Sequence, residues 1–440
     1  MIWPTIFAVL GLLRRLFSAS EKRERPAPYI NWSLDVTGRT VSLPFDRERL
    51  RGYSRVVVAV YVLLALGLFS GAFGKPLDND FITYWSASYL SLEGRPAAAF
   101  DLAENDAVQR LAVPVSSKIY PWHYPPTYQL LVLPLALLPY LPAYLGFIAL
   151  SVIAYIAALR KLLDWPDAIF LLLAYPGSFI CILHGQNSLI TAALFALGVS
   201  ASARKPLIAG ICFGLLAYKP QLGLLIPVAL LAAGQWSIFA AAAATVFGFA
   251  GVATAVFGFP LWRAFLQHTA MVRSIMERDL VPWEKMPTAF VFLRWMGIPQ
   301  ELAYVGQVIT AIAAATAVFM AWRRQGPSLL AGEILVSGSL IVWPYVFDYE
   351  LAILAVPLAI IATDMAERGS RRWEPPVLLV LYCAPILTTA IAKLTHLQVG
   401  FLEILAVLLF CVHRLFWMPI WQIGPGPEVN TASREVRQTH

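Results

Sequence analysis

Charged residues are scarce in this sequence. Asp, Glu, Lys and Arg make up 13% of its 440 residues, against roughly 25% in a typical soluble domain. Hydrophobic residues reach 59%, and the mean hydropathy is +0.67. A water-soluble chain of this length could not bury so much apolar surface and keep a charged coat, which excludes soluble enzymes, nucleic-acid-binding proteins and disordered chains. A polytopic all-α membrane protein remains, because helices satisfy their own backbone groups in lipid.

Cysteine and metal-binding motifs are also lacking. The four cysteines lie in apolar runs without paired spacing, which is typical of small buried hydrophobic residues. The six histidines show no metal-ligand spacing, and the sequence contains no HExxH, P-loop or GxGxxG motif. The DxD-like triplet Asp78-Asn79-Asp80 is the one candidate for a divalent ion. We expect neither a cofactor nor a metal.

The apolar runs predict about twelve membrane spans, since each span needs about 20 mainly apolar residues. The stretch 124–159 contains five prolines, so we interpret it as one crossing with breaks. The short run 2–13 has no cleavage site after it, which favours an interfacial helix over a signal peptide. The candidate spans are 56–73, 124–159, 166–183, 188–203, 204–218, 221–233, 236–258, 302–322, 328–346, 349–363, 375–394 and 399–417.

Lysine and arginine set the expected orientation. Residues 1–55 carry ten of them, which predicts a cytoplasmic N-terminus. Twelve crossings from there place 22 of the 33 Lys and Arg on the cytoplasmic side, and the long connections 74–123 and 259–301 on the outer face. The expected parts are a basic cytoplasmic segment, a transmembrane domain with two long outer loops and a cytoplasmic polar tail, over residues 1–54, 55–420 and 421–440.

The first long outer loop contains a helical pattern. Phe81, Trp85, Ser88 and Leu92 recur at i, i+4, i+7 and i+11, which predicts a helix on the membrane surface. Asp78 or Asn79 could act as its N-cap.

The same threading places five polar clusters on the outer face. Polar residues at span ends are costly unless they are paired or used, so their convergence predicts an outward-facing site. Each cluster also admits a simpler interpretation, namely a helix cap, an aromatic belt, a tight turn, a lysine reaching lipid phosphates, or solvated turn residues. The clusters are Asp78-Asn79-Asp80, Trp122-His123-Tyr124, His184-Gly185-Gln186-Asn187, Tyr218-Lys219-Pro220-Gln221 and Tyr345-Val346-Phe347-Asp348-Tyr349-Glu350.

Several segments between about residues 55 and 420 occur in an order that resembles glycosyltransferase family 87. They are Asp80-Phe-Ile-Thr-Tyr-Trp-Ser-Ala-Ser-Tyr, Glu93-Gly-Arg-Pro-Ala-Ala-Ala-Phe-Asp101, Tyr124-Pro-Pro-Thr-Tyr-Gln, Gly185-Gln-Asn-Ser188, Lys219-Pro-Gln221, Met286-Pro-Thr288 and Pro344-Tyr-Val-Phe-Asp-Tyr349. The resemblance implies a GT-C-type transmembrane bundle. It also implies that a hexosyl unit, expected to be mannosyl, is transferred with inversion from a polyprenyl-phosphate sugar. It also implies a catalytic base at Asp80, with Asp78 as a nearby competitor.

Such a transfer needs one base and a stabilised leaving phosphate. The expected partners are the lipid-phosphate sugar donor, a glycolipid or polysaccharide acceptor and membrane lipids, without nucleic acid. The expected location is a bacterial inner membrane, with the site on the periplasmic or outer face. Candidates for binding the donor phosphate or substrate are Asp78, His123, Tyr124, His184, Gln186, Asn187, Lys219, Gln221, Arg263, Arg273, Arg278, Tyr345 and Asp348.

Two other functions stay open on the sequence. Broken helices and many spans also suit a sugar transporter or lipid flippase, for which Asp348 and Glu350 are the candidate coupling residues. A non-catalytic assembly partner with the same scaffold is the other, and the presence of Asp80 weighs against it.

Overall fold

The computed structural model describes residues 33–35, 40–42, 47–69, 78–114, 118–163, 165, 167–278 and 280–417. The chain forms two compact units, residues 1–43 and 44–440. In the first unit, β1 (Ser33–Asp35) pairs antiparallel with β2 (Thr40–Ser42). The expected interfacial helix over 2–13 and the expected tail over 421–440 lie outside the described residues.

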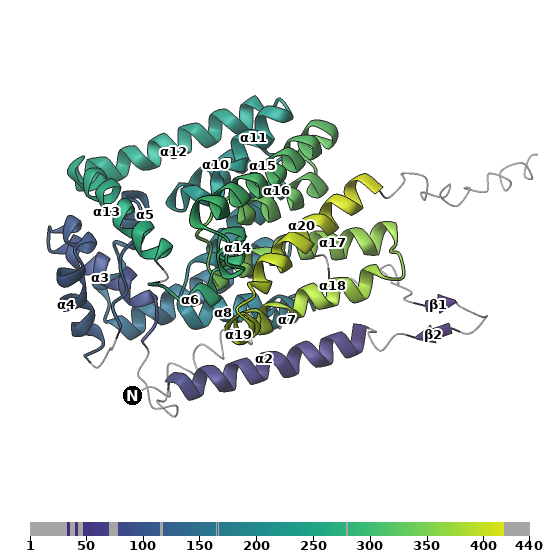
Figure 1. Ribbon diagram of the computed structural model, residues 1–440, viewed down its shortest axis with the longest axis horizontal. Coiled ribbons are helices and arrows are strands. Elements are labelled where there is room, and N and C mark those ends of the chain that lie inside the picture. Colours follow the sequence, from purple (N-terminus) through teal and green to yellow (C-terminus); the bar gives the residue numbers. More distant parts are fainter. Residues whose placement is uncertain are drawn as a thin grey trace, which may run out of the picture. The chain divides into compact units, whose positions relative to one another are not determined.

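In the second unit, every regular element within the described ranges is a helix (Figure 1). The α-helices are α2 (Arg47–Phe69), α3 (Phe81–Leu92), α4 (Leu102–Ala112), α5 (Pro126–Val132), α6 (Tyr140–Leu159), α7 (Ala168–Ala174), α8 (Pro176–His184), α9 (Ser188–Ala201), α10 (Pro206–Leu215), α11 (Leu225–Ala232), α12 (Trp236–Phe257), α13 (Pro260–Glu277), α14 (Ala289–Trp295), α15 (Gln300–Gln325), α16 (Leu329–Ile341), α17 (Ala355–Arg368), α18 (Glu374–Cys383), α19 (Pro385–Thr395) and α20 (Val399–Trp417). Short 3₁₀ helices connect them: η1 (Pro96–Phe100), η2 (Leu135–Leu137), η3 (Leu216–Tyr218), η4 (Pro220–Gly223), η5 (Trp283–Lys285) and η6 (Asp348–Leu354).

Within the described residues, six helical segments are long and apolar enough to cross a membrane, and the bent pair α18–α19 would make a seventh. The six are Arg49–Gly67, Tyr140–Leu159, Trp236–Phe257, Gln300–Gln325, Asp348–Arg368 and Val399–Phe416. Five shorter apolar helices accompany them. The structure therefore confirms a helical membrane protein, whereas twelve crossings stay a prediction.

The proline-rich stretch 124–159 divides where its prolines predict. Pro126 begins α5, Pro134 precedes η2, and Pro139 caps α6. Of these three helices only α6 is long enough to span alone.

Burial separates the helices at the centre of the second unit from those at its edge. The η6–α17 segment is mostly buried and packs against α8, α9 and α16. By contrast, α2 and α12 are largely exposed and lie at opposite edges of this unit in Figure 1. The exposed side chains of α12 are apolar (for example Phe247, Val252 and Val256), as expected of a surface that faces lipid.

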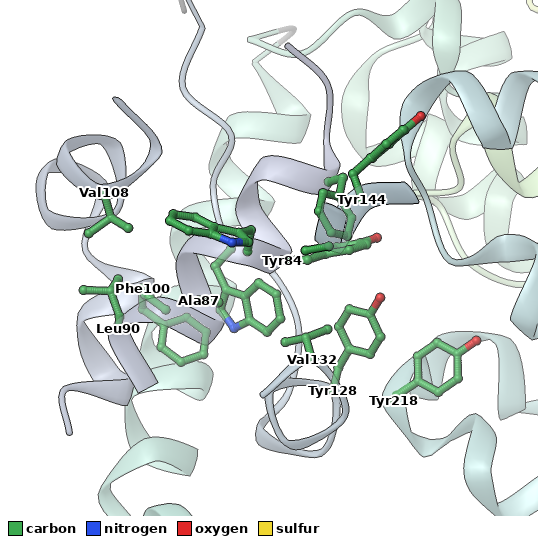
Figure 2. Close-up of a cluster of buried hydrophobic side chains, with 14 of the residues drawn as sticks. Tyr84, Ala87, Leu90, Phe100, Val108, Tyr128, Val132, Tyr144 and Tyr218 are labelled. Atoms are coloured by element: carbon green, nitrogen blue, oxygen red, sulfur yellow. The ribbon is translucent and has the colours of Figure 1, made fainter. Parts of the chain in front are cut away.

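The helix expected from the pattern Phe81, Trp85, Ser88 and Leu92 is confirmed as α3, and its expected place at the membrane surface stays a prediction. Nine of its twelve residues are buried, and it packs against α4, α5, η1 and η2. Its whole circumference is apolar or small, so it has no polar face to turn to water. Figure 2 shows the aromatic core that it forms with α5 and η3, including Tyr84, Tyr128 and Tyr218.

Candidate active site

Asp80 immediately precedes α3, and its side chain does not cap this helix. Its side chain makes no hydrogen bond to the first turn of the helix. Instead the neighbouring Asn79 accepts a hydrogen bond from the Phe81 backbone N–H (3.2 Å) and donates one to the Leu183 carbonyl (3.1 Å). The capping role that the sequence left between Asp78 and Asn79 thus falls to Asn79. The Asp80 carboxylate is available for tertiary contacts.

Those contacts come from the turn between α8 and α9. Gln186 Nε2 donates to Asp80 Oδ2 (2.9 Å), and His184 Nδ1 lies 3.6 Å from the same oxygen. Between them Gly185 has a left-handed backbone conformation with φ 66°. A Cβ atom at Gly185 would lie 2.7 Å from the Phe81 Cβ, so the close approach of this turn to α3 requires glycine.

The environment keeps the Asp80 carboxylate ionised. Its side chain is 26% exposed. Burial alone would raise its pKa, but the contacts with His184 and Gln186 and the positive charge of Lys285 together hold the pKa below the ordinary value of 3.8. At neutral pH the group is therefore a carboxylate that can accept a proton.

His184 links Asp80 to two further charged groups. Its Nε2 atom lies 3.4 Å from Lys285 Nζ and 3.8 Å from Asp348 Oδ1. The Nε2 atom of His184 therefore lies between an ammonium group and a carboxylate, while its Nδ1 atom faces Asp80. Asp348 is buried at the start of η6, where its Oδ2 accepts a hydrogen bond from Thr389 (3.1 Å).

Lys285 was not among the residues that the sequence singled out. It ends η5, whose backbone is held by the buried Gln398 through a hydrogen bond to the Trp283 carbonyl (2.8 Å). Its position directly before Met286-Pro-Thr288, one of the family-like segments, was the signal that could have identified it.

Lys219 is committed to another partner. Its ammonium lies 3.0 Å from Glu350 Oε1 and 3.4 Å from Ser188 Oγ, and its side chain is only 2% exposed. Glu350 in turn accepts from the Phe347 backbone N–H (3.2 Å). This buried ion pair joins the residue before η4 to η6, beside the Tyr349 ring (5.4 Å). A direct contact of Lys219 with phosphate stays a prediction, and it would have to compete with Glu350.

Tyrosine hydroxyls fix the orientation of Gln186. Tyr124 donates to Gln186 Oε1 (3.1 Å), Tyr84 donates to the same oxygen, and the two hydroxyls lie 2.9 Å apart. With its oxygen occupied in this way, the amide directs its NH₂ group to Asp80. Figure 2 shows the hydroxyls of Tyr84, Tyr128 and Tyr218 pointing to the same side of the aromatic core.

The structure brings together five of the residues predicted for the site, Asp80, Tyr124, His184, Gln186 and Asp348, with Lys219 next to them. Three other candidates, Asn187, Asp78 and Gln221, lie within two residues of members of this group in the sequence. The side-chain amide of buried Asn187, at the N-cap of α9, has no hydrogen-bond partner among the described residues. The backbone oxygen of Asp78 accepts from the Tyr120 hydroxyl (3.1 Å), and Gln221 is half-buried in η4.

The arginines predicted in the second long loop lie elsewhere. Arg263 lines a hollow with other residues of Phe259–Gln267, none of which belongs to the Asp80 cluster. Arg273 pairs with Glu277 (2.7 Å), and Arg278 is exposed after the end of α13. Tyr345 hydrogen-bonds to Tyr304, which also donates to Glu277 (2.6 Å). Arg273, Glu277, Tyr304 and Tyr345 form a separate polar group. The roles of the three arginines and of Tyr345 at the donor phosphate stay predictions.

No three His, Cys, Asp or Glu side chains among the described residues are arranged to hold a metal ion. The expectation of a metal-free protein stays a prediction.

Comparison with known families gives one match. The sequence profile of glycosyltransferase family 87 matches residues 122–344, about half of the chain. Searches of the curated proteins and of the solved structures found no match. The matched range includes His184, Gln186, Lys219 and Lys285, while Asp80 lies before it. The chain belongs to glycosyltransferase family 87 and is a helical membrane glycosyltransferase.

Proposed function

We propose that the protein transfers a hexosyl unit, mannosyl by family resemblance, from a polyprenyl-phosphate sugar to an acceptor hydroxyl, with inversion and with Asp80 as the general base. The acceptor is a sugar of a glycolipid or polysaccharide, on the periplasmic face of a bacterial inner membrane. The bundle follows the GT-C arrangement with about twelve crossings. The observation that carries the proposal is a partly exposed, ionised carboxylate between a histidine and an oriented amide.

The reaction needs only one displacement. Asp80 takes the proton from the acceptor hydroxyl, and the hydroxyl oxygen forms a bond to the anomeric carbon. The bond between that carbon and the phosphate oxygen breaks, and its electron pair leaves with the lipid phosphate. A positioned base contributes about 100- to 10,000-fold to such a step. The proton returns to solvent or to the phosphate when the products leave.

Lys285 supplies the positive charge for the leaving phosphate. It contacts His184, and its charge acts on both Asp80 and Asp348. A preorganised cation stabilises the negative charge that develops on the phosphate oxygen. The half-buried side chain of Lys285 is also more accessible than Lys219, which is buried against Glu350.

Asp80→Asn tests the base directly. In the purified full chain in lipid nanodiscs, with polyprenyl-phosphate mannose as donor and hexyl mannoside as acceptor, we expect transfer to fall by about 100- to 10,000-fold. The amide keeps the size of the side chain, so the thermal stability should stay close to that of the unaltered protein.

Asp78→Asn is the matched control and should keep most of the activity. Full activity of Asp80→Asn would remove Asp80 as the base, and loss only in Asp78→Asn would move the role there. Uptake of a free sugar into vesicles without any lipid-linked donor would favour a transporter.

A further inference from the structure

A pair of histidines, His123 half-buried and His268 buried, lies beside the Asp80 cluster. His123 belongs to the segment before α5, and His268 belongs to α13 and is 7% exposed. Their rings are stacked, with centroids 5.7 Å apart, and the Phe100 ring of η1 lies 5.4 Å from His268. Three parts of the chain that are distant in sequence therefore meet at this pair.

Both imidazoles have unused hydrogen-bonding capacity. His123 Nδ1 and His268 Nε2 are buried and have no hydrogen-bond partner within the described part of the chain. The other side of His268 interacts with the backbone of Phe100. The indole N–H of Trp122, next to His123, is also buried and unpartnered among those residues. Buried polar atoms in native proteins are almost always satisfied by protein, water or ligand, so such a concentration indicates a binding site.

The charge state of the pair restricts what it can bind. Burial and the neighbouring His268 lower the pKa of His123 to about 3, and burial also lowers the pKa of His268. Both rings are therefore neutral at physiological pH. A neutral imidazole offers one donor and one acceptor, which suits hydroxyl groups and provides no charge for a phosphate. The Phe100 ring beside His268 adds a flat apolar surface.

The pair is continuous with the proposed base. The negative charge of Asp80 acts on His123. Tyr124, the residue after His123, donates to Gln186 Oε1 (3.1 Å), and Gln186 donates to Asp80 (2.9 Å). The histidine pair is thus linked to the carboxylate through Tyr124 and Gln186. Lys285, from the second long loop, contacts His184, which also faces this carboxylate.

We propose that His123 and His268 form the subsite for the acceptor sugar, binding the neutral hydroxyls of a terminal hexoside and directing one of them to Asp80. This rests on the proposed function, because it divides the site into a neutral acceptor side and a cationic donor side. The terminal hexoside belongs to either a glycolipid or a polysaccharide.

His268→Phe removes the ring nitrogens and keeps an aromatic ring of similar size. In the nanodisc assay we expect the KM for methyl mannoside as acceptor to rise roughly tenfold or more. The KM for polyprenyl-phosphate mannose, and the slow hydrolysis of this donor by water, should not change. His268→Gln places an amide near the position of Nε2 and should recover part of the loss.

His413→Phe is the control, since His413 also packs against an aromatic ring, Trp373 (5.1 Å), but belongs to α20. An unchanged acceptor KM in His268→Phe, or an equal rise of both KM values, would overturn the proposal. Hexyl and methyl mannoside distinguish the source of the sugar. A lower KM for hexyl mannoside than for methyl mannoside indicates a glycolipid acceptor, and equal KM values indicate a polysaccharide.

Binding can be measured without transfer. In Asp80→Asn protein without donor, methyl mannoside should shift the imidazole ¹⁵N resonances of His123 and His268 but not that of His413. With six histidines in the chain, single substitutions assign these resonances. If methyl mannoside leaves the His123 and His268 resonances unshifted, the subsite is overturned, even if Asp80→Asn abolishes transfer. If these resonances shift but the Asp80→Asn protein still transfers sugar, only the role of Asp80 as the base is refuted.

Discussion

Two groups of charged side chains differ in how completely they are paired and buried. One is the Asp80 cluster, where the carboxylate is partly exposed and contacts His184 and Gln186. The other lies among α17, α18 and α20, where the Arg414 side chain is 0% exposed. Figure 1 shows these three helices at the end of the helical unit away from α3 and α4.

Each of the three nitrogens of the Arg414 guanidinium has an acceptor. Nε donates to Asp364 (2.7 Å), Nη1 to Glu374 (2.7 Å) and Nη2 to the Gly369 carbonyl (3.2 Å). A buried charge that is paired in this way holds helices together and is not accessible to a substrate. Asp80 retains accessible acceptor capacity beside a cation. Burial alone therefore does not mark a reactive charge, whereas incomplete pairing together with access to solvent does.

Arg414→Leu tests the structural role of the Arg414 group and has the largest expected effect. Removal of the guanidinium leaves Asp364 and Glu374 buried without it, and such a loss costs about 3–5 kcal/mol. We expect a large drop in the free energy of unfolding in lipid, measured by steric trapping. Arg368→Leu removes the exposed partner of the same Asp364 and should cost no more than about 1 kcal/mol. Equal stability of the two variants would contradict a structural role for Arg414.

Lys285→Gln tests the functional side of the comparison. Loss of a charge-assisted contact with the leaving phosphate is worth about 1.5–3 kcal/mol, so kcat/KM for the lipid-phosphate sugar should fall roughly 10- to 100-fold. Thermal stability should change little, because Lys285 is half-buried and its carboxylate neighbours keep other partners. Lys219→Gln, by contrast, should destabilise the protein by leaving Glu350 buried alone. If Lys285→Gln is inactive but is also destabilised as much as Lys219→Gln, the role of Lys285 is structural.

The pH dependence of kcat/KM tests whether Asp80 is the base, and the expected effect is the smallest of the three. Because the pKa of Asp80 is lowered in the folded protein, its ionised form persists as the pH falls through the ordinary carboxylate range and is lost only below the lowered pKa. The acid limb of kcat/KM should therefore lie below pH 3.8. His184→Asn removes a contact that lowers the pKa of Asp80, while burial still raises it. The acid limb of kcat/KM should therefore move to higher pH. It should not move in His413→Asn.

Local patterns predicted part of this architecture correctly. The period of apolar residues predicted α3 with its observed bounds, Phe81–Leu92, because periodicity depends on neighbours in the chain. Its burial was not predicted, since a local pattern does not say which elements pack around a helix. The approach of Asp80 to the turn after α8 was anticipated by the common outer face of their clusters.

The composition is sufficient to identify a helical membrane protein, because with 59% hydrophobic and 13% charged residues only helices satisfy the backbone groups in lipid. The sequence also supplied the ordered motifs of glycosyltransferase family 87. Only the tertiary structure decided which charges are partners: Lys219 with Glu350, 131 residues away, and Lys285 with His184, 101 residues away. Contacts across such separations depend on how helices pack, which no local pattern encodes.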